Sequence, residues 1–215
     1  MNAGDDIPAQ APAVLAASPR LFQNPLLDRL SRVHHLVPLL LYLPATVALL
    51  CEAATLNISA ATIAAGLFGG YVIWTLVEYL GHRFLFHYRF TTEAGRRLQF
   101  LIHGVHHDHP NDPLRLVMPP LMSLPIMAAA WLLLRTAFGA GKCLPVLAGF
   151  IAGYLVYDML HYHIHHRRPK TAFGRYLRYR HMHHHFRDDS SWFGVSAPWW
   201  DAVFDTRPAD DKHAV

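Results

Sequence analysis

Histidine is the residue type in this sequence with the most scope for chemistry, and its distribution is uneven. Of the 17 histidines, 14 lie within residues 82–109 and 161–185. Ten of these fall into four short motifs, two of which read H-x-x-H-H. The ten are His82 and His87; His103, His106 and His107; His161 and His165; and His181, His184 and His185.

The spacing of these histidines predicts shared faces on helices. Residues at i, i+3 and i+4 lie on one side of an α-helix, so we expect each H-x-x-H-H motif to present three imidazoles in one direction. The pair His161 and His165 does the same. His82 and His87 are five residues apart, which fits a helix end that is bent or unwound.

Imidazoles at this density indicate metal binding. If they were protonated, neighbouring rings would repel each other, whereas a metal ion holds them neutral and offsets the loss of their hydration. Imidazole ligands suit iron, zinc or copper. Ten ligands exceed the roughly four to six that one ion uses, so we expect two metal ions.

The remaining residues of these segments are assigned supporting roles. We expect hydrogen bonding or indirect support of the ligands from the histidines that break the spacing. Glu78 and Asp158 precede ligand positions by about one helical turn, so each either orients an imidazole or caps a helix. The histidines that break the spacing are His109, His163, His166 and His183.

Four apolar stretches must position these motifs. The composition is 53% hydrophobic and 16% charged, and the stretches cover about residues 36–56, 60–80, 116–138 and 143–160. Each is long enough to cross a bilayer as a helix of roughly 20 residues. A soluble protein could bury one such helix, but four in a chain of 215 residues favour a membrane protein. Pro119, Pro120 and Pro125 are expected to kink or break the third helix near its start.

The basic residues predict the orientation of these helices. With four spans, 17 of the 19 Lys and Arg residues share one side with every histidine, and only Arg135 and Lys142 lie on the other. The positive-inside rule places the larger set in the cytoplasm. We therefore predict an all-α integral membrane protein with four transmembrane helices and a cytosolic, histidine-rich helical cap that holds a di-metal centre. Residues 1–35 form a polar N-terminal segment and 36–215 a single membrane domain.

Several function classes are excluded or disfavoured. The two cysteines form no C-x-x-C pair, and the net charge of +4 accompanies no nucleic-acid-binding module, so no nucleic-acid partner is expected. The acidic start does not resemble a secretory signal. The sequence shows no nucleophile triad, phosphate loop or H-E-x-x-H motif. A metal site beside a membrane points to a substrate with a lipid chain, and a pair of irons with O2 can attack its unactivated C–H bonds.

Four segments resemble the fatty acid hydroxylase superfamily of membrane di-metal enzymes, and most closely its fatty acid 2-hydroxylase branch. They are HRFLFH, HGVHHDHPNDPLRLVMPP, YDMLHYHIHH and RYRHMHHHFRDDSSWFGVSAPWWDAVFDT. The resemblance covers about residues 70–207 and includes the Trp-Asp-x-x-Phe ending at Trp200, Asp201 and Phe204. It implies that the ten motif histidines hold two metal ions, with iron expected for activity and zinc able to occupy a purified sample.

The resemblance also implies an activity and its partners. It implies O2-dependent hydroxylation at carbon 2 of a long-chain fatty acid or acyl chain, including acyl chains of sphingolipids. Many members carry a heme domain with an H-P-G-G motif, which this sequence lacks. We therefore expect an external electron donor: a b-type cytochrome, a ferredoxin or a reductase. The expected location is a bacterial inner membrane or the endoplasmic reticulum, with the active site facing the cytoplasm.

Two alternatives stay open at this point. A related enzyme could hydroxylate a sterol or carotenoid, or desaturate an acyl chain. A metal transporter or metal-storing membrane protein would instead carry its ligands inside the helices at mid-membrane depth. The aromatic residues Trp192, Phe193, Trp199 and Trp200 are expected either to line a substrate entry or to sit at the lipid interface.

Overall fold

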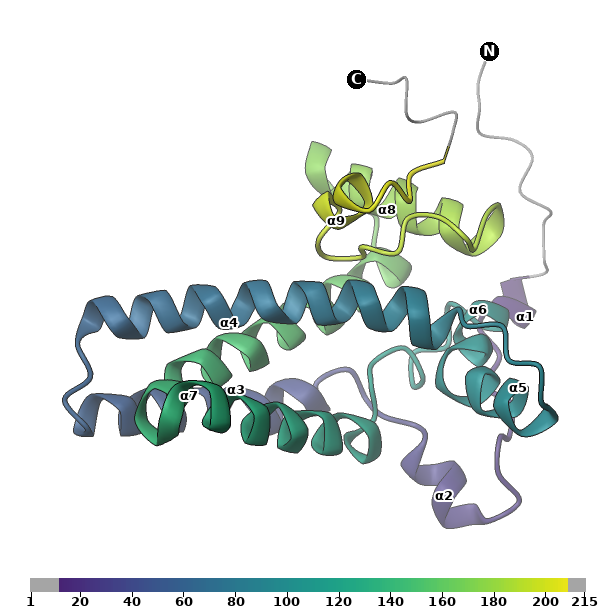
Figure 1. Cartoon of the computed structure of the whole chain (residues 1–215). Helices are drawn as coiled ribbons and strands as arrows, with labels where there is room; N and C mark the ends of the chain where they lie inside the picture. The colour runs from purple at the N-terminus through teal and green to yellow at the C-terminus, as the bar shows by residue number, and fades with distance from the viewer. Residues whose placement is uncertain (1–11, 209–215) are drawn as a thin grey trace. The chain divides into compact units, whose positions relative to one another are not determined.

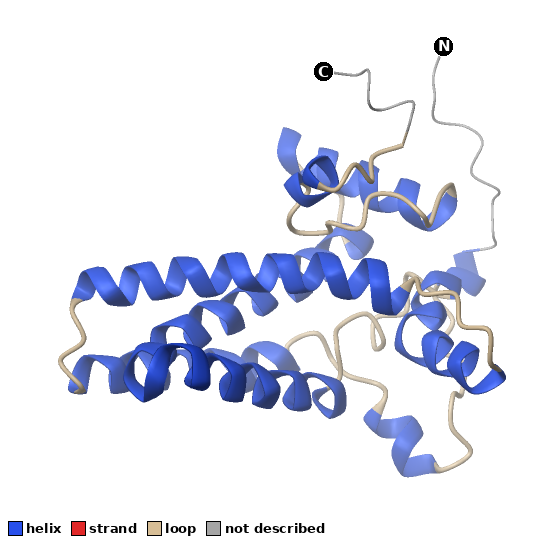
Figure 2. Ribbon diagram, in the orientation of Figure 1, coloured by secondary structure: helices blue, strands red, loops and turns tan. Residues whose placement is uncertain are grey.

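The chain is helical throughout the part that the structure describes. The computed structural model describes residues 12–208, and no strand occurs among them (Figure 2). The α-helices are α1 (Pro12–Leu15), α2 (Pro25–Leu30), α3 (Val37–Thr55), α4 (Ala60–Gly81), α5 (Glu93–Gln99), α6 (Val105–Asp108), α7 (Pro120–His166), α8 (Ala172–Phe186) and α9 (Trp199–Val203). Two π-helices, η1 (His82–Phe86) and η2 (Phe100–Gly104), complete the set.

The chain divides into two compact units. One, here called the apolar unit, contains Phe22–Glu78 and Val117–Leu160. The other, the histidine unit, contains the chain up to Leu21, Tyr79–Leu116 and the chain from His161 onward. Each unit is therefore assembled from segments that are far apart in the sequence.

Among residues 12–208, three helices are long and apolar enough to cross a membrane: Val37–Thr55, Ala60–Phe86 and Pro120–His166. The first two match the predicted spans 36–56 and 60–80. The third contains both of the remaining apolar stretches in 47 residues. The prediction of four separate apolar helices therefore differs from the structure, in which α7 contains the third and fourth stretches.

Helix α7 nevertheless folds back on itself at Gly139. This glycine has φ +77° and ψ 168°, a backbone conformation that residues with a side chain rarely adopt. The Met118 backbone N–H donates a hydrogen bond to Asp158 Oδ1 at 3.2 Å, although a straight helix would place these residues about 60 Å apart. The two arms of α7 are thus antiparallel, as Figure 1 shows. Pro120 begins the first arm, and Pro125 lies inside it, so only the expected break at the start of the helix occurs.

Two glycines let α4 and the second arm of α7 approach closely. A methyl group added at Gly70 would lie 1.9 Å from the carbonyl oxygen of Val146, and one at Gly149 would lie 2.1 Å from that of Leu67. Small residues of this kind are typical of helix interfaces in membranes. Much of the outer surface of α3 and α4 is apolar and exposed, including Leu40 and Phe68. That surface is the one expected for helices that contact lipid.

The histidine unit is built from short helices with defined starts. Thr92 caps α5 by accepting a hydrogen bond from the Gly95 N–H at 3.2 Å. Thr171 caps α8 in the same way through Gly174, at 3.1 Å. Such caps satisfy N–H groups that have no partner within the helix. After α8, residues 187–198 form an irregular segment that leads into α9.

Candidate metal centre

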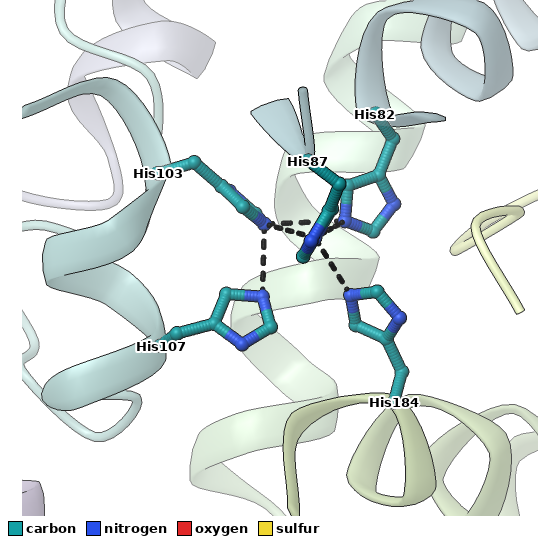
Figure 3. A group of neighbouring side chains, drawn as sticks. All are labelled: His82, His87, His103, His107 and His184. Atoms are coloured by element: carbon teal, nitrogen blue, oxygen red, sulfur yellow. Dashed lines mark hydrogen bonds between the residues drawn. The ribbon is translucent and has the colours of Figure 1, made fainter. Parts of the chain in front are cut away.

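All ten motif histidines lie in the histidine unit, where they form two groups of five. Within each group, the ligand nitrogens all lie within 4.8 Å of one another. Each group could hold a metal ion, and nearly all of its side chains are buried or half-buried. The first histidine group contains His82, His87, His103, His107 and His184 (Figure 3). The second histidine group contains His106, His161, His165, His181 and His185.

The two groups have the same composition: a pair of histidines from a helix end, two histidines of one H-x-x-H-H motif and one histidine of the other motif. Each contains one pair of histidines from a helix end: His82 and His87 in the first group, His161 and His165 in the second. Each also contains the first and last histidines of one H-x-x-H-H motif, at i and i+4. The middle histidine of each motif, His106 or His184, belongs to the opposite group. The expectation that all three histidines of a motif face one site is therefore wrong, because i+3 and i+4 are about 100° apart around a helix.

The five-residue spacing of His82 and His87 is explained by a π-helix. The His87 N–H donates to the carbonyl of His82 at 3.1 Å, which is the i to i+5 bond of that conformation. The wider turn brings both imidazoles to one side, and their Nε2 atoms are 3.2 Å apart. The predicted bent helix end is thus a π-turn. A second π-helix, η2, leads into the motif that begins at His103.

Nitrogen atoms converge in the first group at distances that suit one ion. His87 Nε2 lies 3.0 Å from His184 Nε2 and 3.1 Å from His103 Nε2. His107 Nε2 lies 3.0 Å from His103 Nε2. Two ligands about 2.1 Å from a metal and about 90° apart are about 3.0 Å from each other. Figure 3 shows the ring nitrogens pointing toward a common centre.

The second group has the same character. His181 Nε2 lies 2.9 Å from His161 Nε2 and 2.8 Å from His165 Nε2. His185 Nε2 lies 3.1 Å from the same atom. His106 Nε2 is buried and has no hydrogen-bond partner among the described residues, although its ring centroid lies 4.7 Å from those of His161 and His165. A metal ion would satisfy this nitrogen, since a buried polar atom without a partner is costly.

The environment keeps the imidazoles in the form that binds metal. Burial and the charge of the neighbouring His82 together lower the pKa of His87 to about 3. Burial is also the main cause that lowers the pKa of His184 to about 3. Burial and neighbouring histidines likewise lower the pKa values of five more, which are His103, His106, His107, His181 and His185. These seven imidazoles are therefore neutral near pH 7, with a lone pair available on one nitrogen.

Backbone carbonyls select the tautomer of two ligands in the first group. His82 Nδ1 lies 2.7 Å from the carbonyl oxygen of Phe193, and His184 Nδ1 lies 2.7 Å from that of Ser191. A carbonyl oxygen can only accept, so each Nδ1 carries the proton and each Nε2 carries the lone pair. Hydrogen bonds of this kind hold metal-binding imidazoles in orientation. Neither Ser191 nor Phe193 was predicted to act in this way, because a backbone group leaves no signal in a sequence.

The two histidine groups adjoin within the histidine unit. The ring centroids of His103 and His106, which belong to different groups, are 5.6 Å apart. Those of His107 and His184, both in the first group, are 5.1 Å apart. Two ions held by these groups would be neighbours rather than separate structural metals.

The histidines outside the motifs occupy other positions. His109 Nδ1 bonds to the carbonyl of Val14 at 2.7 Å, as expected for a hydrogen-bonding role. His183 packs on the ring of Trp192, with centroids 4.8 Å apart. His163 and His166 belong to neither group, and His34 and His35 lie in the apolar unit. His213 lies outside the described residues.

The structure also places the other residues considered from sequence. Asp158 accepts the Met118 N–H and so links the second arm of α7 to the residues just before the first arm, while its choice between orienting an imidazole and capping a helix stays a prediction. Glu78 is buried in the apolar unit, and its role stays a prediction. Trp192 and Phe193 are only 2% and 5% exposed, so neither sits at a lipid interface. Trp199 is 45% exposed and retains that role as a prediction.

Solvent reaches the first group beside His87. A cleft of about 270 Å³ is lined by His87, Arg89, Arg96 and Asp189, among others. A second cleft, of about 210 Å³, shares His87 and Asp189 and adds Arg83. The Asp189 carboxylate lies 3.9 Å from His87 Nδ1. This basic approach was not predicted from the sequence, because Arg83, Arg89 and Arg96 lie in different elements and follow no common spacing.

An all-helical chain with apolar helices and two groups of five imidazoles defines a histidine-rich membrane protein with a candidate di-metal centre. A family model described as fatty acid hydroxylase matches residues 67–206, which include all ten histidines. The chain belongs to the fatty acid hydroxylase family, as its motifs predict.

Individual relatives agree with this assignment. The chain is 34% identical to the dihydroceramide fatty acyl 2-hydroxylase FAH2 of Arabidopsis thaliana, over 92% of this chain and 83% of that protein. It is 39% identical to the fatty acid 2-hydroxylase of Rattus norvegicus, over 64% of this chain and 38% of the relative. A solved structure described as full-length scs7p, with only the hydroxylase domain visible, matches with a TM-score of 0.81 and 32% identity. That match covers 86% of this chain and 70% of the other.

Proposed function

We propose that this chain is a membrane-bound fatty acyl 2-hydroxylase with one metal ion in each histidine group. The observation that carries the proposal is the convergence of ten imidazoles into two adjoining groups of five. The relatives named above are 2-hydroxylases of fatty acids or of dihydroceramide acyl chains, which supports an acyl chain as the substrate. Acyl chains of sphingolipids are included in this class.

Iron is the metal that we propose for the active enzyme. Two irons with O2, two electrons and two protons would supply the oxidising power to convert one C–H bond at carbon 2 into C–OH, with the second oxygen atom leaving as water. Zinc binds the same imidazoles with higher intrinsic affinity than ferrous iron, so a purified sample could hold zinc and be inactive. We further propose that the electrons come from a separate b-type cytochrome, ferredoxin or reductase.

The protein's own residues prepare the site for this chemistry. Burial keeps the ligand imidazoles neutral, and the carbonyls of Ser191 and Phe193 hold two of them in a fixed tautomer. The buried ring of Phe193 lies 5.7 Å from those of His82 and His87, so it shields the first group from water. His87 is the ligand beside the solvent-filled clefts, so it marks the side from which a small polar molecule reaches the site.

We also propose a topology of four membrane spans with a cytosolic metal site. The hairpin at Gly139 supports it, because each arm of α7 is then about long enough to cross a bilayer. The distribution of Lys and Arg supports the orientation, with Arg135 and Lys142 alone on the far side. None of the ten histidines belongs to the apolar unit, which favours an enzyme over a transporter with ligands at mid-membrane depth.

Lipid analysis of expressing cells tests the activity. Cells that express the wild-type chain are expected to gain 2-hydroxy acyl chains, both free and in sphingolipids where the host makes them. A His184→Ala chain, expressed to the same level, is expected to lack the product. A His109→Ala chain is expected to keep it, because the His109 side chain bonds to the carbonyl of Val14 and belongs to neither histidine group. A new double bond, or a hydroxylated sterol or carotenoid, would replace the proposal with a related reaction. Metal binding without any lipid product would favour a transport or storage role.

A further inference from the structure

The segment Ser191–Gly194, here called the carbonyl segment, connects the first histidine group to a buried ion pair. Its carbonyls at Ser191 and Phe193 accept the Nδ1 protons of His184 and His82. Because these two carbonyls set the direction of two imidazoles, any group that fixes the segment also fixes the ligands.

Asp201 is the residue that fixes this segment. Its Oδ1 accepts the Phe193 N–H at 2.8 Å, and its Oδ2 accepts the Gly194 N–H at 3.0 Å. Oδ1 also accepts the hydroxyl of Thr206 at 2.7 Å. The carboxylate is fully buried. A Cβ at Gly194 would lie 2.9 Å from Asp201 Oδ2, so the glycine permits this close approach.

Arg180 completes the arrangement. Its Nη2 donates to Asp201 Oδ2 at 2.5 Å, and only 2% of its surface is exposed. The guanidinium lies over the rings of Tyr176 and Trp192, 5.3 and 5.2 Å from their centroids. Trp192 has φ +54°, which is unusual for a residue with a bulky side chain. The backbone N–H of Trp192 donates to the Thr206 carbonyl at 2.9 Å, and the N–H of the next residue, Phe193, donates to Asp201. These two hydrogen bonds hold the strained backbone in place.

Further hydrogen bonds connect Asp201 to the residue that follows His82. The Thr206 hydroxyl gives its proton to Asp201, so the Tyr79 hydroxyl, 2.9 Å away, must donate to Thr206. Arg83 Nη1 in turn donates to the Tyr79 hydroxyl at 3.1 Å. Arg83 follows His82 directly in the sequence. The hydrogen bonds therefore form one network around His82 and His184.

Three histidines of the second group lack a carbonyl partner of this kind among the described residues. The Nδ1 atoms of His165, His181 and His185 are buried and have no hydrogen-bond partner there. Their orientation depends on packing and on one another. The described hydrogen bonds of Asp201 lead to the carbonyl segment, whose carbonyls bind two histidines of the first group.

We propose that Asp201, paired with Arg180, is a positioning residue that tightens metal binding at the first histidine group and not at the second. This inference rests on the proposed metal centre and adds that its two sites are unequal. Asp201 contacts no histidine of the two groups in these hydrogen bonds, so it acts through the carbonyl segment and through the hydroxyls of Thr206 and Tyr79.

The test is a competition titration of the full chain in detergent with Fe²⁺ under anaerobic conditions, against a chromogenic chelator. The wild-type chain is expected to yield two dissociation constants. Asp201→Asn is expected to raise one of them about 10–100-fold, the range for loss of an orienting contact, and to leave the other unchanged. Asp112→Asn is the matched control, because Asp112 is an equally buried carboxylate of the same unit that accepts the Leu114 N–H instead.

Combining Asp201→Asn with a substitution in either histidine group shows which group loses Fe²⁺ affinity. In a His184→Ala chain the first group is already disrupted, so Asp201→Asn should cause no further loss of Fe²⁺ binding. In a His165→Ala chain the disrupted group is the second, and Asp201→Asn should then weaken the ion that remains tightly held. Such non-additivity separates a coupled pair from two independent effects.

The outcomes separate this proposal from the proposed function. If the wild-type chain binds two ions and Asp201→Asn changes neither constant, or weakens both equally, the positioning role is wrong while the metal centre stands. If the wild-type chain binds no ion, the metal centre is wrong and this inference falls with it. If Asp201→Asn does not fold, the Thr206→Val variant tests the proposal instead. This substitution removes one hydrogen bond to Asp201 and leaves the charges of Asp201 and Arg180 unchanged. It should weaken the same site by a smaller factor, and unchanged binding would overturn the proposal.

Discussion

The rings of His107 and His185 stack face to face, with centroids 4.1 Å apart and planes 20° from parallel. His107 belongs to the first histidine group and His185 to the second. Each is the last histidine of its H-x-x-H-H motif, so equivalent positions of the two motifs meet where the groups adjoin. This contact is the structural basis for treating the groups as one centre.

The exchange of middle histidines makes a prediction about two adjacent residues. His106 and His107 serve different groups, so replacing either with Ala should weaken a different ion. In a His184→Ala background, adding His107→Ala should leave the second ion in place, whereas adding His106→Ala should weaken both. Metal content by plasma mass spectrometry measures this directly. Equal losses in the two double variants would contradict the assignment of the groups.

Metal removal should destabilise the chain because the ligands are buried. Binding that occurs only in the folded state adds about 4 kcal/mol when the free ion is about 1,000 times its dissociation constant. A strong chelator is therefore expected to lower the thermal unfolding midpoint of the wild-type chain. The His106→Ala/His184→Ala chain should respond little, since both of its groups are incomplete. An equal response of the two chains would show that the chelator acts elsewhere.

The close approach of α4 to α7 predicts unequal effects at two neighbouring glycines. Gly70→Ala would push a methyl group onto the Val146 carbonyl, so the helices must separate at a cost of about 1–3 kcal/mol. Gly69→Ala meets nothing within 4 Å and should be neutral or slightly stabilising. Thermal unfolding in detergent compares them. Similar unfolding midpoints for the two variants would argue against tight packing at this interface.

The proposed topology predicts which loops are open to each side of the membrane. In a chain with Cys51→Ser and Cys143→Ser, a cysteine introduced by Asn57→Cys should react with an impermeant maleimide added to intact cells. One introduced by Thr91→Cys should react only after the membrane is opened. The reverse pattern would place the metal site on the outer side and overturn the orientation drawn from Lys and Arg.

The sequence pattern identified the ten histidines that come together but not how they divide into two groups. Spacing of i and i+4 identifies pairs such as His161 and His165, because local helix geometry alone brings them together. The assignment of His106 and His184 depends on how helices from different parts of the chain pack, which no local pattern records. The π-turn after His82 was foreseen only as a distortion.

The first two apolar helices were predicted well from the sequence. The apolar runs at residues 36–56 and 60–80 predict their position and length, since membrane spans need a long run of apolar side chains. The hairpin of α7 lies between the predicted spans 116–138 and 143–160, and the chain reverses there through the positive φ of Gly139. The proposed role of Asp201 could not be predicted from its motif, because its partners are backbone groups, the hydroxyl of Thr206 and an arginine 21 residues away.

The most direct test of the central claim counts the ions on the intact chain. Native mass spectrometry of the full chain, loaded with Fe²⁺ without O2 and released from detergent, gives the number of metal ions per chain. Two ions are predicted for the wild-type chain, with fewer bound to the His106→Ala and His184→Ala variants. A wild-type chain that binds a single ion or none after loading would contradict the assignment of the ten histidines to two metal sites.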